Sequence, residues 1–155
     1  MQPIVEFEIL EENGMVGIAP KRGTSQSSGI DVFVPYGFNN HVEDVAKNSD
    51  IIIPLNIRLK IPEGYDLEVK NKSSIATQLR LFKGAELIDV DYRGNVRIHL
   101  FNFNDHLIEI KDGMKIAQLV LRPVVISDWK QVENIDLDTE RGEGWQGSTG
   151  DRNDG

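Results

Sequence analysis

The sequence predicts an all-β domain, in the form of a sandwich, a jelly roll or a small barrel, with one short helix. Two observations carry this prediction. Several segments alternate polar and apolar residues with a period of two, and turns rich in Gly, Asp or Pro separate them. Many short strands joined by such turns are typical of these architectures. The 155 residues suffice for one domain with a hydrophobic core.

Four segments alternate strictly and are predicted as half-buried strands. They are VEFEI at 5–9, IRLKI at 57–61, YDLEV at 65–69 and VRIHL at 96–100. In the first of them, Val5, Phe7 and Ile9 would share one buried face. Two more apolar segments are predicted as strands buried on both faces, IDVFV at 30–34 and IAQLVL at 116–121.

The remaining chain contains one helix candidate, one long loop and a glycine-rich end. SSIATQLRLF at 73–82 is predicted to be helical, with Ser73 or Ser74 as its cap. Residues 36–50 are polar and aperiodic, which favours a surface loop. We expect residues 1–138 to form the folded domain, with Trp129 packed near its end. Residues 139–155 would then be a flexible arm that orders on binding a ligand.

Composition narrows the function classes. The net charge of −8 argues against a general nucleic-acid binder, which needs a basic surface. The chain has no cysteine, so disulfides and thiolate sites are excluded. No signal peptide and no run of membrane-spanning length is present. We therefore expect a soluble cytoplasmic protein without nucleic-acid or membrane partners.

The segment ELIDVDYRGNVRIHL at 86–100 contains the first candidate for chemistry. Period two would place Asp89 and Asp91 on the same side of a strand. A carboxylate in such a setting can act as a general base, which contributes about 10²–10⁴-fold to a rate. The alternative is a hairpin in which Asp91 bonds its own turn and Tyr92 packs. For Asp89 the pattern leaves both interpretations open.

Polar residues in three other segments point to an anion. Two serines at a helix start, next to Lys70 and Lys72, can form an anion site, although a plain cap is the alternative. Gln118 is polar within an apolar run, so its amide must bond either the backbone or a ligand. Asp31 follows a glycine at a strand start, where an ordinary strand-end aspartate is the alternative.

The segment RGEGWQGSTG at 141–150 combines glycines, hydroxyls and one arginine. A glycine-rich backbone can form a nest of N–H groups around phosphate oxygens. Arg141 would add a bidentate charged donor. By composition alone, a disordered tail is the alternative.

Taken in order, five segments resemble the five motifs of the homotrimeric dUTPase family. They are SSGIDVFV at 27–34, KSSIA at 72–76, ELIDVDYRGNV at 86–96, GMKIAQLVL at 113–121 and RGEGWQGSTG at 141–150. The resemblance implies a jelly-roll or distorted β-barrel and a threefold-symmetric homotrimer whose active sites each draw on three subunits. It also implies Mg²⁺-dependent hydrolysis of dUTP to dUMP and pyrophosphate, which keeps uracil out of DNA and supplies dUMP for thymidylate synthesis.

The resemblance implies a role for each matching residue. Asp89 would activate the attacking water, and Tyr92 would stack beneath the deoxyribose. The surrounding hairpin, residues 83–97, would read uracil largely through backbone groups. Asp31 would act near the metal through a bound water. The implied phosphate and substrate contacts are Lys72, Ser73, Ser74, Gln118, Arg141, Trp145, Gln146, Gly147, Ser148 and Thr149.

The chain departs from the family pattern at several of these positions. Lys72 replaces an arginine, which keeps the charge and loses the bidentate fork. Lys83 stands where an asparagine is often found, and Glu86 where a glycine is common. Gln146 stands at the position of a phenylalanine that stacks on uracil, so we hypothesise that Trp145 forms the lid. The alternatives are a nucleotide-binding or regulatory module with weak or altered activity and an enzyme related to dCTP deaminase.

Overall fold

The computed structural model describes residues 2–38 and 44–144. The contacts divide the chain into two units, Met1–Val125 and Ile126–Gly155, and all the strands and the helix lie in the first. Their bounds are β1 Glu6–Ile9, β2 Glu11–Glu12, β3 Met15–Val16, β4 Lys21–Arg22, β5 Ile30–Phe33, β6 Asp50–Pro54, β7 Ile57–Lys60, β8 Tyr65–Asn71, α1 Ser73–Gln78, β9 Leu81–Lys83, β10 Leu87–Ile88, β11 Arg97–Asn102 and β12 Lys115–Pro123.

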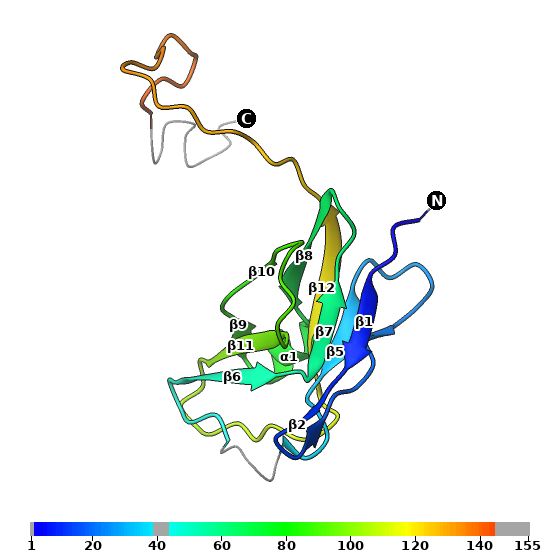
Figure 1. Ribbon diagram of the computed structural model, residues 1–155. Coiled ribbons are helices and arrows are strands. Elements are labelled where there is room, and N and C mark those ends of the chain that lie inside the picture. Colours follow the sequence, from blue (N-terminus) through cyan, green and yellow to red (C-terminus); the bar gives the residue numbers. More distant parts are fainter. Residues whose placement is uncertain (1, 39–43, 145–155) are drawn as a thin grey trace. The chain divides into compact units, whose positions relative to one another are not determined.

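The strands form antiparallel sheets (Figure 1). The largest has the order β10-β8-β12-β5-β4, a second has the order β6-β11-β9, and β1-β7 and β2-β3 are two-stranded. This mostly β architecture with one short helix is of the jelly-roll type and confirms the predicted fold class. Among the described residues, no helix is long and apolar enough to span a bilayer.

Two of the alternating segments bury the apolar face that their sequence pattern predicts. Ile57, Leu59 and Ile61 are buried, and so are Ile98 and Leu100 on β11. The strand β5, which lies between β12 and β4, buries both Asp31 and Val32, so burial on both faces is confirmed. The largest fully buried side chains are Phe38, Ile53, Leu55, Ile57, Leu81, Ile98, Leu100, Ile110, Ile116, Val32, Val34 and Val45.

The first strand departs from the predicted burial. β1 pairs with β7 in an antiparallel manner, but Phe7 and Ile9 are 49% and 46% exposed. Cross-strand ion pairs of Glu6 with Lys60 and of Glu8 with Arg58 cover the other face. Period two therefore predicted the strand correctly, but Phe7 and Ile9 are only about half-buried, because Phe7 borders an open pocket beside the five-stranded sheet.

The helix is shorter than predicted. It ends at Gln78, and Leu81–Lys83 instead forms β9, which pairs with β11. Arg80 has a positive φ of 49°, a left-handed conformation that turns the chain between the two elements. Asn104 donates a hydrogen bond of 2.7 Å to the Leu79 carbonyl and satisfies one of the free groups at the helix end.

Two further predictions need correction. The 36–50 segment is not only surface, because Phe38 and Val45 are each 1% exposed and Val45 bridges to Ile108. Trp129 is 94% exposed, so the prediction that it packs is wrong.

Candidate active site

Asp31 is the centre of a cationic cluster on the five-stranded sheet. It lies on β5 opposite Gln118 of β12 and is 5% exposed. Lys72 Nζ lies 3.0 Å from Oδ1, and Lys115 Nζ lies 3.1 Å from Oδ2. Burial raises the pKa of the Asp31 carboxyl, but hydrogen bonds and charge from the two lysines outweigh it and hold the pKa below its ordinary value.

The start of α1 lies beside this cluster. Lys72 is the N-cap residue, with extended backbone, and its carbonyl accepts a hydrogen bond of 3.0 Å from the Ala76 N–H. Ser73 and Ser74 are therefore the first helical residues, and the prediction that one of them caps the helix is wrong. Ser73 is exposed and Ser74 partly exposed, and neither side chain caps the helix, so both hydroxyls can serve a ligand.

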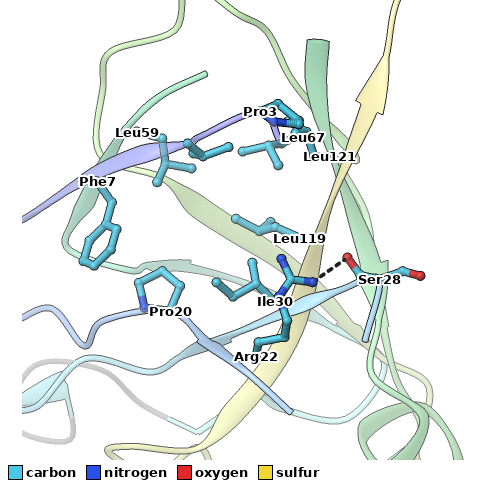
Figure 2. Close-up of a pocket in the computed structure, with 11 residues that line it drawn as sticks. Pro3, Phe7, Pro20, Arg22, Ser28, Ile30, Leu59, Leu67, Leu119 and Leu121 are labelled. Atoms are coloured by element: carbon cyan, nitrogen blue, oxygen red, sulfur yellow. Dashed lines mark hydrogen bonds between the residues drawn. The ribbon is translucent and has the colours of Figure 1, made fainter. Parts of the chain in front are cut away.

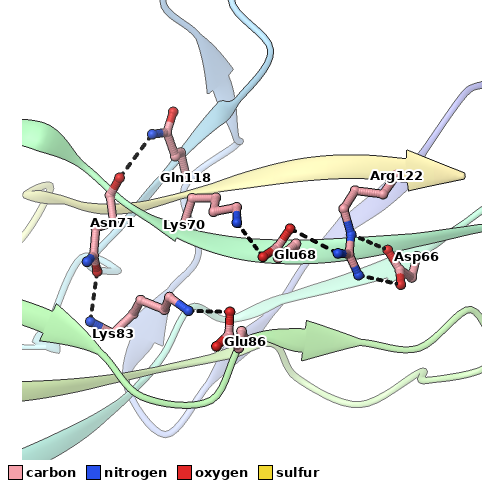
Figure 3. Close-up of polar contacts among 8 residues, drawn as sticks. All are labelled: Asp66, Glu68, Lys70, Asn71, Lys83, Glu86, Gln118 and Arg122. Carbon is pink, nitrogen blue, oxygen red and sulfur yellow. Dashed lines mark hydrogen bonds and ion pairs between the residues drawn. The ribbon is translucent and has the colours of Figure 1, made fainter. Parts of the chain in front are cut away.

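Gln118 bonds the backbone, the commoner of the two alternatives. Its Nε2 donates to the Asn71 carbonyl at 3.0 Å (Figure 3). Its Oε1 lies over Gly29, where an added Cβ would approach that oxygen to 2.2 Å. The close approach explains the glycine before β5. The structure thus brings together Asp31, Lys72 and Gln118.

The segment that contains Asp89 forms a turn. Asp89 follows the end of β10, and the Tyr92 N–H donates to its carbonyl at 3.1 Å. Asp89 and Asp91 are therefore not neighbours on one face of a strand, and that prediction is wrong. The Asp89 carboxylate is exposed, which a residue that meets substrate and water requires.

Asp89 and Tyr92 border a small pocket of about 160 Å³. Its lining is Leu87, Ile88, Asp89, Tyr92, Val96 and Arg97, and it includes no residue of the cationic cluster. Pockets that hold drug-sized ligands typically measure about 300–1,000 Å³. The pocket by itself is therefore smaller than a site for a nucleoside triphosphate.

The bend between β9 and β10 borders a network of charges (Figure 3). Lys83 pairs with Glu86, and this hydrogen bond lowers the pKa of the Glu86 carboxyl. The Lys83 N–H donates to Asn71 Oδ1 at 2.8 Å. On β8 and β12, Arg122 binds Asp66 through two nitrogens, at 3.1 and 2.9 Å. Lys83 and Glu86, the two residues that depart from the family pattern here, thus neutralise each other at the edge of the hairpin.

A second pocket, of about 180 Å³, is apolar and lies between β1 and the five-stranded sheet (Figure 2). Leu67, Leu119 and Leu121 form one wall, and Arg22 at the rim donates to the Ser28 carbonyl at 3.4 Å. No predicted site residue lines it.

Only the beginning of the predicted arm lies in the described residues. Arg141 Nε donates to the Gly144 carbonyl at 3.0 Å, and the Gly142 N–H donates to Thr139 Oγ1 at 3.0 Å. Trp145, Gln146, Gly147, Ser148 and Thr149 lie outside the described residues, so their predicted roles stay predictions.

Neither Lys115 nor Asn71 was among the predicted site residues, although Lys115 lies in the GMKIAQLVL segment that resembles the fourth motif. Asn71 contacts the site through both its side chain and its carbonyl. Lys115 begins β12, one residue before its apolar run. Its place in that segment was the available signal, but its contact with Asp31 depends on strand pairing that is not encoded locally.

The oxygen donors of the site fit a metal ion that is bound mainly by the substrate's phosphates. Within residues 2–38 and 44–144 no group of three or more His, Cys, Asp or Glu side chains could hold a metal. Mg²⁺ usually keeps several waters and binds through one or two carboxylates and substrate phosphates. Asp31 is a buried anionic oxygen donor whose oxygens have lone pairs beyond those used by the lysines, so a water-mediated contact fits it.

Comparison with known proteins agrees with this geometry. The dUTPase family profile matches residues 16–150. A deoxyuridine 5'-triphosphate nucleotidohydrolase of Mus musculus is 37% identical over 132 residues, which cover 85% of this chain and 78% of that protein. The matches cover 62% of the Rattus norvegicus relative and 50% of the mitochondrial Homo sapiens relative.

Solved structures share the fold. The dUTPase of Staphylococcus bacteriophage 80alpha with dUpNHpp has a TM-score of 0.78 at 24% identity, covering 95% of this chain and 98% of that chain. A mutant dUTPase from phage phi11 of S. aureus, which coordinates a structural Mg(II) ion, has a TM-score of 0.69 at 23% identity, covering 86% and 99%.

Proposed function

Because the chain belongs to the dUTPase family, we propose that it hydrolyses dUTP to dUMP and pyrophosphate. The observation that carries the proposal is that the cationic groups and the exposed carboxylate lie in two separate parts of the fold. A buried carboxylate holds two lysines beside Gln118 and a helix start, and an exposed carboxylate lies in a separate small pocket with Tyr92. Cations that bind a triphosphate and a base that activates water are the parts this reaction needs.

Asp89 is proposed to accept a proton from the water that attacks the α-phosphorus. Its carboxylate is exposed, and the turn that holds its backbone also holds Tyr92. The Tyr92 ring is 43% exposed and is proposed to pack against the deoxyribose and to exclude a 2′-hydroxyl. The bend with Lys83 and Glu86 lies beside the expected base.

Lys72, Ser73, Ser74 and Gln118 are proposed to bind the phosphates. Lys72 and Lys115 both face Asp31, so two ammonium groups lie close together where an anionic phosphate would bind. Mg²⁺ on the triphosphate would neutralise charge that develops on its oxygens. Asp31 is proposed to contact that metal through water.

A homotrimer is proposed as the assembly in which these parts meet. The pocket at Asp89 lacks the phosphate-binding residues and is too small for the substrate. A neighbouring subunit would bring its own Lys72 and Gln118 to it. In Ile126–Gly155, the side chains of Ile126, Trp129 and Ile135 are 84%, 94% and 71% exposed. Burying such apolar surface against another subunit would stabilise the assembly.

The arm is proposed to close the site. We keep residues 1–138 as the folded domain and 139–155 as the arm. Arg141, Ser148 and Thr149 would bind phosphate, and Trp145, Gln146 and Gly147 would lie over the base. Closure excludes water and strengthens the electrostatic contacts inside the site.

The decisive experiment is pyrophosphate release with Mg²⁺ from dUTP, dCTP, dTTP and UTP, with Asp89→Asn as the matched variant. We expect selective release from dUTP and a loss of about 10²–10⁴-fold in the variant. Ammonia release from dCTP would show a deaminase instead. A folded trimer that releases no pyrophosphate would overturn the proposal in favour of a binding or regulatory module.

A further inference from the structure

Asn56 and Asn95 form a reciprocal amide pair beneath the turn that contains Tyr92. Asn95 Nδ2 donates to Asn56 Oδ1 at 2.9 Å, and the Asn56 backbone N–H donates to Asn95 Oδ1 at 3.0 Å. A backbone N–H can only donate, so this second bond fixes which end of the Asn95 amide is the oxygen. Two opposed bonds between the same residues define both the distance and the rotation of the pair.

Asn56 is the fixed member of the pair. It is 1% exposed and has a φ of 51° in the connection between β6 and β7. Its Nδ2 donates to the carbonyls of Glu12 and Met15 at 3.2 and 2.9 Å. Its own carbonyl accepts from the Leu10 N–H at 2.8 Å. The amide is therefore anchored to the β2–β3 hairpin.

Asn95 is the member that contacts the candidate site. Its carbonyl accepts the hydrogen bond of the Tyr92 hydroxyl at 2.9 Å. The Tyr92 ring lies directly over Gly94, where an added Cβ would come within 2.4 Å of the hydroxyl oxygen. This bond and this contact restrain the orientation of the exposed Tyr92 ring.

We propose that Asn56 and Asn95 are positioning residues that set the Tyr92 ring and thereby the preference for deoxyribonucleotides over ribonucleotides. The inference rests on the proposed function, in which Tyr92 lies against the sugar. Loss of either amide frees the Asn95 backbone to move, and the ring then tilts and admits a 2′-hydroxyl. The two residues act as a unit, so either change alone should have the effect of both.

The test compares Asn56→Gly, Asn95→Ala and the double variant. Glycine keeps the left-handed backbone at position 56 available. We expect the ratio of kcat/KM for dUTP over UTP to fall about tenfold in each single variant. The double variant should lose no more than the singles. Asn102→Ala is the matched control, because Asn102 is also 1% exposed and donates to three backbone carbonyls, at the other end of β11.

Unchanged sugar selectivity in folded Asn95→Ala, with a stability loss like that of Asn102→Ala, would overturn the inference. Additive losses of selectivity in the double variant would overturn the pairing as well. A wild-type protein that does not hydrolyse dUTP would defeat the proposed function instead. In that event, slow exchange of the Tyr92 hydroxyl proton by NMR in the wild type, lost in Asn95→Ala and kept in Asn102→Ala, would still support the positioning. Equal exchange in all three would refute it.

Discussion

Replacing Asp31 by asparagine should expose the role of the cationic cluster, because the change keeps the shape of the side chain and removes its charge. The carboxylate holds Lys72 at 3.0 Å and Lys115 at 3.1 Å on opposite oxygens. An amide offers one oxygen and one NH₂ group. One ammonium would therefore face a donor, and the two cations would lose the anion that they share.

The magnitude follows from the exposure of the partners. Hydrogen bonds to charged groups contribute about 1.5–3 kcal/mol each, whereas exposed ion pairs contribute about 0–1 kcal/mol. The Lys72 side chain is 27% exposed and the Lys115 side chain 47%, so the Lys72 contact should dominate. We expect a loss of about 2–4 kcal/mol in the free energy of unfolding, with a fall in Tm of about 5–15 °C.

Denaturant and thermal unfolding, each with and without saturating inorganic pyrophosphate, would measure the effect. Phosphate oxygens can replace the lost carboxylate between the lysines, so pyrophosphate should stabilise Asp31→Asn more than the wild type. Asp66→Asn is the matched control. Asp66 is 6% exposed and bound by Arg122, outside the site. It should lose stability similarly and show no extra rescue.

Two outcomes would refute this reasoning. A loss below about 0.5 kcal/mol would mean that the carboxylate does not hold the lysines. Equal stabilisation of both aspartate variants by pyrophosphate would mean that Lys72 and Lys115 do not form the phosphate site.

Three further predictions follow from the same contacts. The folded-state pKa of Asp31 is lowered, so the ionised Asp31 stabilises the fold above about pH 4, and this stabilisation is lost as the pH falls through the folded pKa. The difference in free energy of unfolding between the wild type and Asp31→Asn should therefore shrink in acid. A difference that stays constant with pH would contradict the role of the Asp31 charge. Gly94→Ala would place a Cβ 2.4 Å from the Tyr92 hydroxyl and should lower dUTP-over-UTP selectivity about tenfold with under about 1 kcal/mol of destabilisation; kinetics with both nucleotides beside thermal unfolding would check it. Glu86→Gln should leave the urea midpoint of unfolding nearly unchanged at physiological salt, because the Glu86 side chain is 56% exposed and exposed ion pairs are screened; a clear fall in that midpoint would refute this.

Local pattern alone predicted most of the central strands. Period two at 57–61 and 96–100 placed Ile57, Leu59 and Ile98 correctly in the core, because alternation reports which face of a strand meets water. The same pattern failed at β1, where Phe7 is exposed. Alternation shows that two faces differ, and only the neighbouring elements decide whether one of them is covered.

The helix boundary shows the same limit. Residues 73–82 suit a helix locally, yet Leu81–Lys83 pairs with β11. Hydrogen bonds to a strand far along the chain outweigh a weak helical preference over one turn. Arg80 then adopts a left-handed conformation that nothing in its sequence neighbourhood requires.

By itself, the sequence determined the all-β class, the residue types of the chemistry and the motif order that identifies the family. Tertiary structure decided which of those residues meet. For Asp31 the local pattern left an ordinary strand-end aspartate open, and only the tertiary structure shows Lys115 of β12 and Lys72 at the start of α1 on its two oxygens. Asn56 and Asn95 are 39 residues apart, and no local pattern marks them as partners. The local sequence specifies the chemistry of each side chain, but strand pairing across the whole chain sets the distances between side chains.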